Sequence, residues 1–216
     1  MKKFLTIMIL AIAVTTSCTQ DVYEKGEGDW SKIVAEICDG YTASDSMVTR
    51  FVTDDGVAYV VSNPFNTSLM LKPDTIFRAV FYYEKDGEKA EVKGLNRVAV
   101  ISPREIDNVK TDPVRLESMW MGKTKRYINL SVYMMVGVPD SDDAAHQIAC
   151  SRDSVHQNDD GSHTLFLTFY HDQGNVPEYY SQRYYVSIPM QSGAADSVCL
   201  RVNTYDGMLE KRLIIK

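Results

Sequence analysis

Apolar and polar residues alternate along most of the chain, and no stretch shows a sustained period of 3.6 residues. The clearest alternation lies within residues 126–136. One face of this segment would carry Ile128, Leu130, Val132 and Met134, and the other would carry Asn129, Ser131 and Tyr133. A period of two residues is typical of a strand that packs one face on a core. The sequence therefore predicts an all-β protein.

In the first half of the chain, five strand-like segments are separated by turn residues. They cover residues 32–38, 47–53, 57–62, 75–84 and 88–101. Asp54-Asp55-Gly56 and Asp86-Gly87 are typical of hairpin turns, and we expect Gly94 to interrupt the last segment. Five short strands predict an OB-like β-barrel domain over residues 30–105. The usual helix after the third strand is not expected, because residues 63–72 are few and show no helical periodicity.

The second half contains about seven further strand-like segments, after a polar linker at residues 107–113. They cover residues 114–120, 126–136, 147–155, 163–171, 183–190, 197–205 and 208–215. Gly161 and Gly207 lie in the turns of two expected hairpins. Alternating strands with turns at this spacing predict an antiparallel β-sandwich domain over residues 113–216.

The first residues have the pattern of an export signal. Lys2 and Lys3 precede an apolar run at residues 4–14, and small residues lead to Cys18. This run is too short to span a bilayer, which takes about 20 apolar residues. A cysteine at the cleavage position favours a lipobox: residues 1–17 are a signal peptide, Cys18 is lipidated, and residues 18–29 are a polar tether. A plain secretory signal is the alternative.

Composition argues against some partners and some chemistry. The net charge is −6, so binding to the phosphate backbone of a nucleic acid is not expected. Cys38, Cys150 and Cys199 have no metal-type spacing, and we interpret them as small buried residues. The alternative is a disulfide between Cys150 and Cys199, because we expect their strands to be neighbours.

The remaining residues show no catalytic or metal motif. The four histidines lack a ligand spacing and are interpreted as surface residues; they are His146, His156, His163 and His171. Neither G-x-S-x-G nor a glycine-rich phosphate loop is present. Two carboxylates that meet in space would leave no signal in a sequence, so this route to a hydrolase stays open. We predict no enzyme activity, no metal and no cofactor.

Aromatic residues are the remaining candidates for a binding role. We expect Trp120 to fill the core near the junction of the two domains, although it could form a contact patch with Trp30 and Met121. The aromatic residues within 77–83 are interpreted as packing residues. Four tyrosines are the best candidates for a contact surface that would bind a glycan, and they are Tyr179, Tyr180, Tyr184 and Tyr185.

Several segments occur in the order found in one known family. They are residues 29–40 followed by Phe51-Val52-Thr53-Asp54-Asp55-Gly56, then Trp120 and Tyr127-Ile128-Asn129-Leu130, then Phe169-Tyr170-His171-Asp172, then Val186-Ser187-Ile188-Pro189-Met190. Together with the lipobox, they make the chain similar to NigD-like lipoproteins over nearly all of its length after Cys18. The resemblance implies an OB-type domain followed by a β-sandwich, and it brings no catalytic residue with it.

The name of that family comes from a proposed role in bacteriocin immunity. The resemblance therefore implies a non-catalytic lipoprotein whose lipid anchors it to the outer membrane of a Gram-negative bacterium, on the periplasmic or the cell-surface face. Its partner would be a bacteriocin-like protein, and nucleic acid is not expected as a partner. The alternative is a structural or glycan-binding envelope lipoprotein.

Overall fold

The computed structural model describes residues 32–67, 69, 71–138, 144–191, 193 and 195–215. The predicted signal peptide, Cys18, the tether and Trp30 lie outside these residues. Every element in the described part is a β-strand, so the predicted all-β class is confirmed. No helix in that part is long and apolar enough to cross a bilayer.

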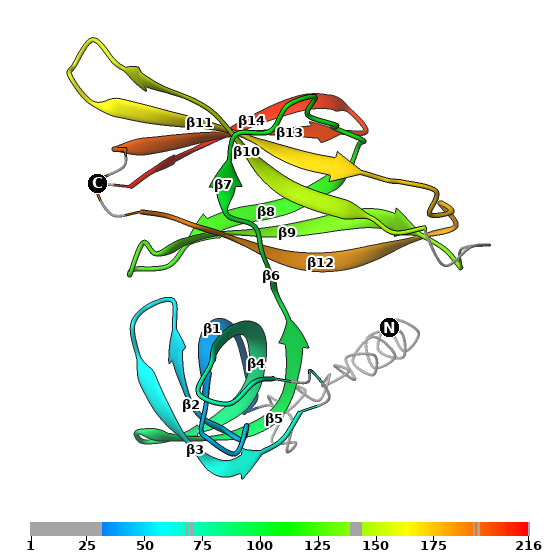
Figure 1. The fold of residues 1–216 in the computed structure, drawn as a ribbon. Coiled ribbons are helices and arrows are strands. Elements are labelled where there is room, and N and C mark those ends of the chain that lie inside the picture. The colour runs from blue at the N-terminus through cyan, green and yellow to red at the C-terminus, as the bar shows by residue number, and fades with distance from the viewer. Residues whose placement is uncertain are drawn as a thin grey trace, which may run out of the picture. The chain divides into compact units, whose positions relative to one another are not determined.

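Residues 34–97 form a closed barrel of five strands (Figure 1). The strands are β1 (Val34–Thr42), β2 (Val48–Thr53), β3 (Ala58–Phe65), β4 (Ile76–Asp86) and β5 (Lys89–Arg97). Their order is β1-β2-β3-β5-β4, and β4 closes the barrel by pairing with β1. β3 and β5 pair in parallel, whereas the other neighbours are antiparallel. The predicted OB-like barrel is confirmed.

A turn and a bulge set the register of the barrel strands. Gly56, between β2 and β3, has φ +87°, a conformation that a side chain would strain. On β5, Val92 pairs with Tyr83 and Gly94 pairs with Tyr82, so Lys93 is an extra residue in a bulge. The interruption expected at Gly94 is therefore a bulge within a continuous strand.

Aromatic rings fill the barrel. Phe51, Phe81 and Tyr83 are fully buried, and the ring centroid of Phe51 lies 4.6 Å from that of Phe81 and 4.8 Å from that of Tyr83. At Gly40 on β1, an added Cβ would come within 2.4 Å of the Phe77 ring. This packing agrees with the interpretation of the aromatic residues within 77–83.

Two further sheets form a β-sandwich-like region in the second half of the chain (Figure 1). One has the order β14-β13-β11-β10-β7, and the other has the order β6-β12-β9-β8. Their strands are β6 (Ala99–Val100), β7 (Pro103–Arg104), β8 (Arg115–Met121), β9 (Tyr127–Val136), β10 (Gln147–Gln157), β11 (His163–Asp172), β12 (Tyr180–Pro189), β13 (Ser197–Thr204) and β14 (Gly207–Ile214). The seven long strands match the predicted segments. Three pairs, β6–β12, β7–β10 and β11–β13, are parallel.

The larger core lies between these two sheets. Leu130 and Val132 on β9 are fully buried together with Leu167 of β11 and Leu200 of β13. The apolar face predicted for β9 is thus confirmed. Its polar face is buried as well at Asn129, which is 0% exposed. This second burial marks the place where the barrel contacts β9.

The chain passes from the barrel to both sheets within a few residues. Arg97 still pairs with Ala79 of β4, whereas Ala99–Val100 pairs with β12 and Pro103–Arg104 pairs with β10. The predicted barrel domain included these residues, because it extended to residue 105. An uninterrupted apolar run does not reveal where a strand changes its partner, which explains the difference. The domain limits themselves stay a prediction.

The three described cysteines are buried, and their thiols are free. β11 lies between β10, which carries Cys150, and β13, which carries Cys199. The two strands are therefore not neighbours, contrary to the expectation. Burial raises the pKa of Cys150 to about 12, so this thiol stays protonated. The interpretation of these cysteines as small buried residues is confirmed.

The prediction of four surface histidines is wrong for His171, which is 1% exposed. Its Nε2 lies 3.0 Å from Nδ1 of His146, and its Nδ1 lies 3.0 Å from the carbonyl oxygen of Asp112. A carbonyl accepts, so His171 Nδ1 donates to it; in a neutral His171 ring, Nε2 then accepts from Nδ1 of His146. The segment that carries Asp112 pairs along the end of β11 and covers the ring, which no local pattern reveals. His156 and His163 are exposed, as predicted.

Candidate binding cleft

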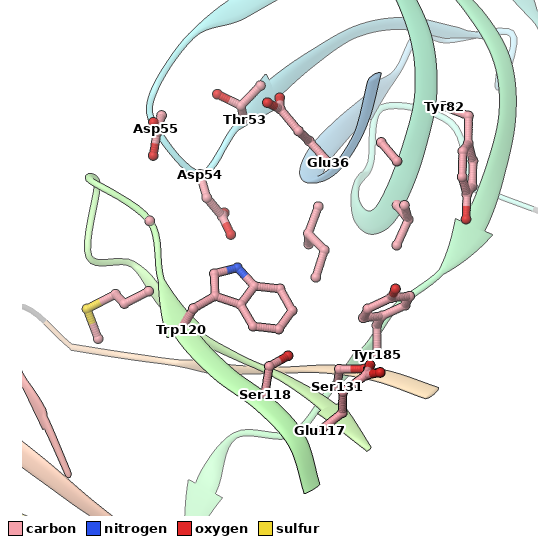
Figure 2. Close-up of a pocket in the computed structure, with 15 residues that line it drawn as sticks. Glu36, Thr53, Asp54, Asp55, Tyr82, Glu117, Ser118, Trp120, Ser131 and Tyr185 are labelled. Carbon is pink, nitrogen blue, oxygen red and sulfur yellow. The ribbon is translucent and has the colours of Figure 1, made fainter. Parts of the chain in front are cut away.

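A cleft of about 620 Å³ lies where the barrel meets the four-stranded sheet (Figure 2). The barrel contributes residues of β1, β2, β4 and the β2–β3 turn, and the sandwich contributes residues of β8, β9 and β12. Its carboxylates are Glu36, Asp54, Asp55 and Glu117, and its aromatic residues are Tyr82, Trp120 and Tyr185. Clefts of this size are typical of ligand sites.

One arginine holds the barrel strands together beside this cleft. Arg78, on β4, is 5% exposed. Its Nη1 donates to Oδ1 of Asp39 at 2.9 Å, and its Nη2 lies 2.7 and 2.6 Å from the two carboxylate oxygens of Asp54. Asp39 belongs to β1, and Asp54 belongs to the β2–β3 turn. Hydrogen bonds between ionised groups are stronger than neutral ones, so they fix three barrel segments at one point.

The same guanidinium binds the sandwich. Nε of Arg78 donates to Oγ of Ser187 at 2.8 Å, and Nη2 donates to Oδ1 of Asn129 at 3.0 Å. Ser187 Oγ also donates to Asn129 Oδ1 at 2.7 Å, and Asn129 Nδ2 donates to Oδ2 of Asp54 at 2.6 Å. These bonds explain why two polar side chains of β9 and β12 are buried, since buried polar groups require partners.

A second arginine balances the charge of this network. Nη1 of Arg126 lies 2.8 Å from Oδ2 of Asp39, so two arginines face two carboxylates. The guanidinium carbon of Arg78 also lies 3.7 Å from the ring centroid of Tyr127, a cation–π contact. Burial and the charge of Asp39 raise the pKa of Tyr127, which keeps its phenol neutral. A protein interior tolerates charges when they are matched and hydrogen-bonded as they are here.

The β2–β3 turn rests on the β8–β9 turn at one end of the cleft. The carbonyl oxygen of Asp54 accepts hydrogen bonds from N and Oγ1 of Thr124, at 3.0 and 2.7 Å. Gly122 makes this approach possible, because an added Cβ would lie 2.4 Å from Cβ of Asp54. Nearby, Nζ of Lys123 forms an exposed ion pair with Asp55 at 2.8 Å.

Aromatic side chains line the middle of the cleft. Trp120, Tyr82 and Tyr185 pack against a small apolar cluster made of Ile37, Val80 and Val98. Figure 2 shows the indole of Trp120 reaching from β8 toward the barrel. This packing agrees with the prediction that Trp120 fills the junction, and it leaves the residue partly exposed to a ligand.

Glu117 is the carboxylate that the sandwich contributes to the cleft. It accepts hydrogen bonds from Oγ of Ser131 at 2.7 Å and from the hydroxyl of Tyr133 at 3.3 Å, and Nε of Arg183 lies 3.4 Å away. The bond from Ser131 is the main reason why the pKa of Glu117 is below its usual value. Glu117 is therefore ionised at neutral pH.

The carboxylates that the barrel contributes to the cleft also accept hydrogen bonds. The hydrogen bonds from Lys123 lower the pKa of Asp55. Glu36, which is partly exposed, accepts the hydroxyl of Tyr83 at 2.6 Å. The cleft therefore presents negative charge and aromatic surface, and its carboxylates are held as hydrogen-bond acceptors.

A second hollow of about 630 Å³ shares Tyr82 and Tyr185 with the cleft. Within it, Nε and Nη2 of Arg183 donate to the hydroxyl of Tyr133 at 2.9 and 2.6 Å. Nδ2 of Asn96 donates to the hydroxyl of Tyr82 at 3.2 Å. The lining therefore combines aromatic rings with fixed amide and guanidinium groups.

The structure divides the four predicted contact tyrosines between different environments. Tyr179 and Tyr180, where β12 begins, are 74% and 55% exposed. Tyr184 packs against the core between the sheets, and Tyr185 faces the cleft. The separation of Tyr184 from Tyr185 follows from strand geometry, because successive side chains of a strand point to opposite faces. A contact role for these tyrosines stays a prediction.

The residues that join the two halves were not among the predicted site residues. Arg78 lies inside an otherwise apolar segment between Phe77 and Ala79, and this is a signal that could have been used. A buried charge requires a partner, but the sequence does not show that Asp39 and Asp54 supply it. The described residues hold no group of three or more His, Cys, Asp or Glu side chains that could bind a metal.

A comparison with known protein families identifies the family of this chain. A family model described as the NigD-like C-terminal beta sandwich domain matches residues 97–214, more than half of the sequence. The chain belongs to the NigD-like family. The match includes all strands of both sandwich sheets, whereas the barrel residues that reach the cleft lie before it.

Solved structures with the same fold come from Bacteroides and Parabacteroides. A NigD-like immunity protein from Bacteroides caccae ATCC 43185 has 20% identity and a TM-score of 0.63 over 84% of this chain and 96% of that chain. A candidate toxin-related protein from Parabacteroides distasonis ATCC 8503 has 18% identity and a TM-score of 0.62 over 84% and 92%. A candidate lipoprotein from Bacteroides fragilis NCTC 9343 has 12% identity and a TM-score of 0.60 over 85% and 98%. At these identities the likeness shows the fold. A comparison with curated proteins gave no match.

Proposed function

We propose that this NigD-like protein is a non-catalytic envelope lipoprotein that binds a bacteriocin-type protein and protects its cell from it. The observation that carries the proposal is the NigD-like sandwich at residues 97–214, together with the likeness to a protein named as a NigD-like immunity protein. The name of the similar Parabacteroides protein also refers to a toxin.

The chemistry of the cleft supports binding over catalysis. Asp55 and Glu117 have pKa values below their usual ones, so neither is poised to donate a proton at neutral pH. Glycosidases, by contrast, raise the pKa of one carboxyl group for that purpose. Asp54 is committed to the network of Arg78 and Asn129. Carboxylates that are held in place by hydrogen bonds in this way are suited to bind a partner.

The proposal includes a lipid anchor at Cys18. The lipobox pattern before this residue supports it, as does the similarity to a candidate lipoprotein from Bacteroides fragilis. Two or more acyl chains would give stable attachment, since one chain binds a membrane only marginally. The anchor would hold the protein at the outer membrane, on the periplasmic or the cell-surface face, where an incoming toxin passes.

A protection assay tests this function. The gene is deleted in its host and restored as wild type, as Cys18→Ala or as Cys199→Ala, and each strain is challenged with culture supernatants of competing strains. We expect protection by wild type and by Cys199→Ala, which loses a buried thiol elsewhere, and no protection by Cys18→Ala. Equal killing of the deleted and restored strains would contradict an immunity role.

Glycan binding is the second candidate function, and the hollow beside the cleft favours it. Aromatic rings next to fixed polar groups offer a sugar both a stacking surface and hydrogen-bond partners. Tyr82, Tyr185 and Arg183 supply these groups. Calorimetry with envelope oligosaccharides tests this candidate, and a Tyr185→Ala variant should lose the heat of binding. If the wild-type protein released no heat of binding, glycan binding would be rejected as a function.

A further inference from the structure

One side of the cleft is an open strand edge. β8 is the last strand of the sheet β6-β12-β9-β8, and within the described residues it pairs only with β9. A bulge between Leu116 and Ser118 interrupts the ladder, so the regular part of the edge runs from Ser118 to Met121. About half of the backbone N–H and C=O groups of an edge strand point away from its single neighbour. They can pair with another extended chain.

The cleft follows this edge. Its lining includes both Trp120 and Met121, which are adjacent in sequence. Adjacent residues of a strand point to opposite faces, so a cavity that contacts both passes along the side of the strand. Figure 2 shows β8 facing the barrel wall, which carries Glu36, across this space.

The charges in the cleft favour a cation. Among the described residues, four carboxylates and no lysine or arginine side chain line it. Three of these carboxylates already have basic partners, which are Arg78, Lys123 and Arg183. Glu36 forms no ion pair within the described residues and accepts only the Tyr83 hydroxyl there. One further positive charge therefore has a place in the cleft.

We propose that the cleft binds an extended segment of a partner protein, which adds a strand to the Ser118–Met121 edge of β8 and directs a lysine or arginine toward Glu36. Backbone hydrogen bonds would supply affinity, and the aromatic and acidic side chains would supply specificity, as in other cases of strand addition. The inference rests on the proposed function and names the partner chemistry of its site. A neutral glycan has no ladder of N–H groups and no positive charge, and it fits this edge less well.

Synthetic peptides test the inference. The probe is an octapeptide of alternating valine and threonine with one central lysine, added to ¹⁵N-labelled protein purified from its host in detergent. We expect amide shifts at Ser118–Met121. Replacing the central lysine of the peptide with glutamate should weaken binding about tenfold, because charges of the same sign would meet. Proline in place of the neighbouring valine should weaken it similarly, because an N–H donor is lost.

Variants of the protein complete the test. Glu36→Gln keeps an acceptor for Tyr83 and should reduce the preference for lysine over glutamate by at least about threefold. Glu210→Gln, on the exposed strand β14 of the other sheet, is the matched control and should leave the preference unchanged. The inference is overturned by shifts elsewhere, by the absence of binding at millimolar peptide, by an unchanged preference in Glu36→Gln, or by neutral oligosaccharides that produce the β8 shifts.

The peptide assay does not use killing, so its outcome is separate from that of the protection assay. Protection by wild type together with no peptide binding would refute this use of the cleft and leave the immunity role in place. Peptide binding without protection would support the edge as a docking site and count against immunity.

Discussion

Replacing Arg78 with alanine would test whether one buried guanidinium holds the barrel on the sandwich. The variant would leave Asp39 with Arg126 alone, and Asp54 with the amide of Asn129. Removing one member of a buried ion pair costs about 3–5 kcal/mol, because the remaining charge loses its partner without regaining water. We expect Arg78→Ala to lower the free energy of unfolding by this amount.

The magnitude follows from the bonds that would be lost. Arg78 donates to four side chains, two of them charged. Hydrogen bonds to charged groups contribute about 1.5–3 kcal/mol each, and neutral ones about 0.5–1.5 kcal/mol. The variant should not lose the sum of these hydrogen-bond contributions, since the desolvation cost of the guanidinium also disappears and Asp54 is partly accessible to water. The net loss should therefore stay within the range given above.

Urea unfolding followed by tryptophan fluorescence and by circular dichroism measures this effect. Arg201→Ala is the matched control, because Arg201 pairs with Asp153 at 2.8 Å but its side chain is 42% exposed. An exposed pair contributes about 0–1 kcal/mol, so the control should change little. If Arg78→Ala also lowered the free energy of unfolding by less than about 1 kcal/mol, this network would not stabilise the packing of the barrel on the sandwich, and the prediction would be refuted.

Three further predictions concern the cleft and the histidine pair. Gly122→Ala should lower the free energy of unfolding by about 1–3 kcal/mol in chemical denaturation, because the added Cβ would overlap the β2–β3 turn. Gly94→Ala should lower it less, because an added Cβ there would lie 3.9 Å from its nearest neighbour. Ser131→Ala should raise the pKa of Glu117 toward 4.5, and an unchanged NMR titration midpoint would contradict the assigned cause. Burial lowers the pKa of His146 below 6.5, so the unfolded chain takes up a proton that the folded chain does not. Unfolding free energy should therefore fall as the pH drops through about 6.5, and it should fall less in His146→Ala.

Local patterns were enough to predict most of the strands. Alternation along β9 identified the face of Leu130 and Val132 that packs into the core. Glycines at turns identified the hairpins, because Gly56 adopts a backbone conformation that few other residues accept. These features depend on residues that are close in sequence, so the sequence carries them directly.

Contacts between distant segments could not be predicted in the same way. Asn129 looked like a surface residue because its own strand alternates, yet its partner Arg78 is 51 positions away. His171 looked like a strand end, and the segment of Asp112 that covers it is 59 positions away. The cleft also depends on such contacts, because one wall belongs to β1, β2 and β4 of the barrel and the other to β8, β9 and β12 of the four-stranded sheet. Only the relative placement of whole sheets determines these neighbours.

The buried network crosses the boundary at residue 97, where the family match begins. Asn129 and Ser187 lie within the matched segment, whereas Arg78, Asp39 and Asp54 lie before it. In a NigD-like sandwich joined to a barrel without this arginine, the buried hydroxyl of Ser187 would lose its donor, and the amide oxygen of Asn129 would keep only Ser187 as a donor. The barrel residue at position 78 and the sandwich residues at positions 129 and 187 should therefore co-vary among related proteins. Such co-variation would show which barrels are compatible with a given sandwich.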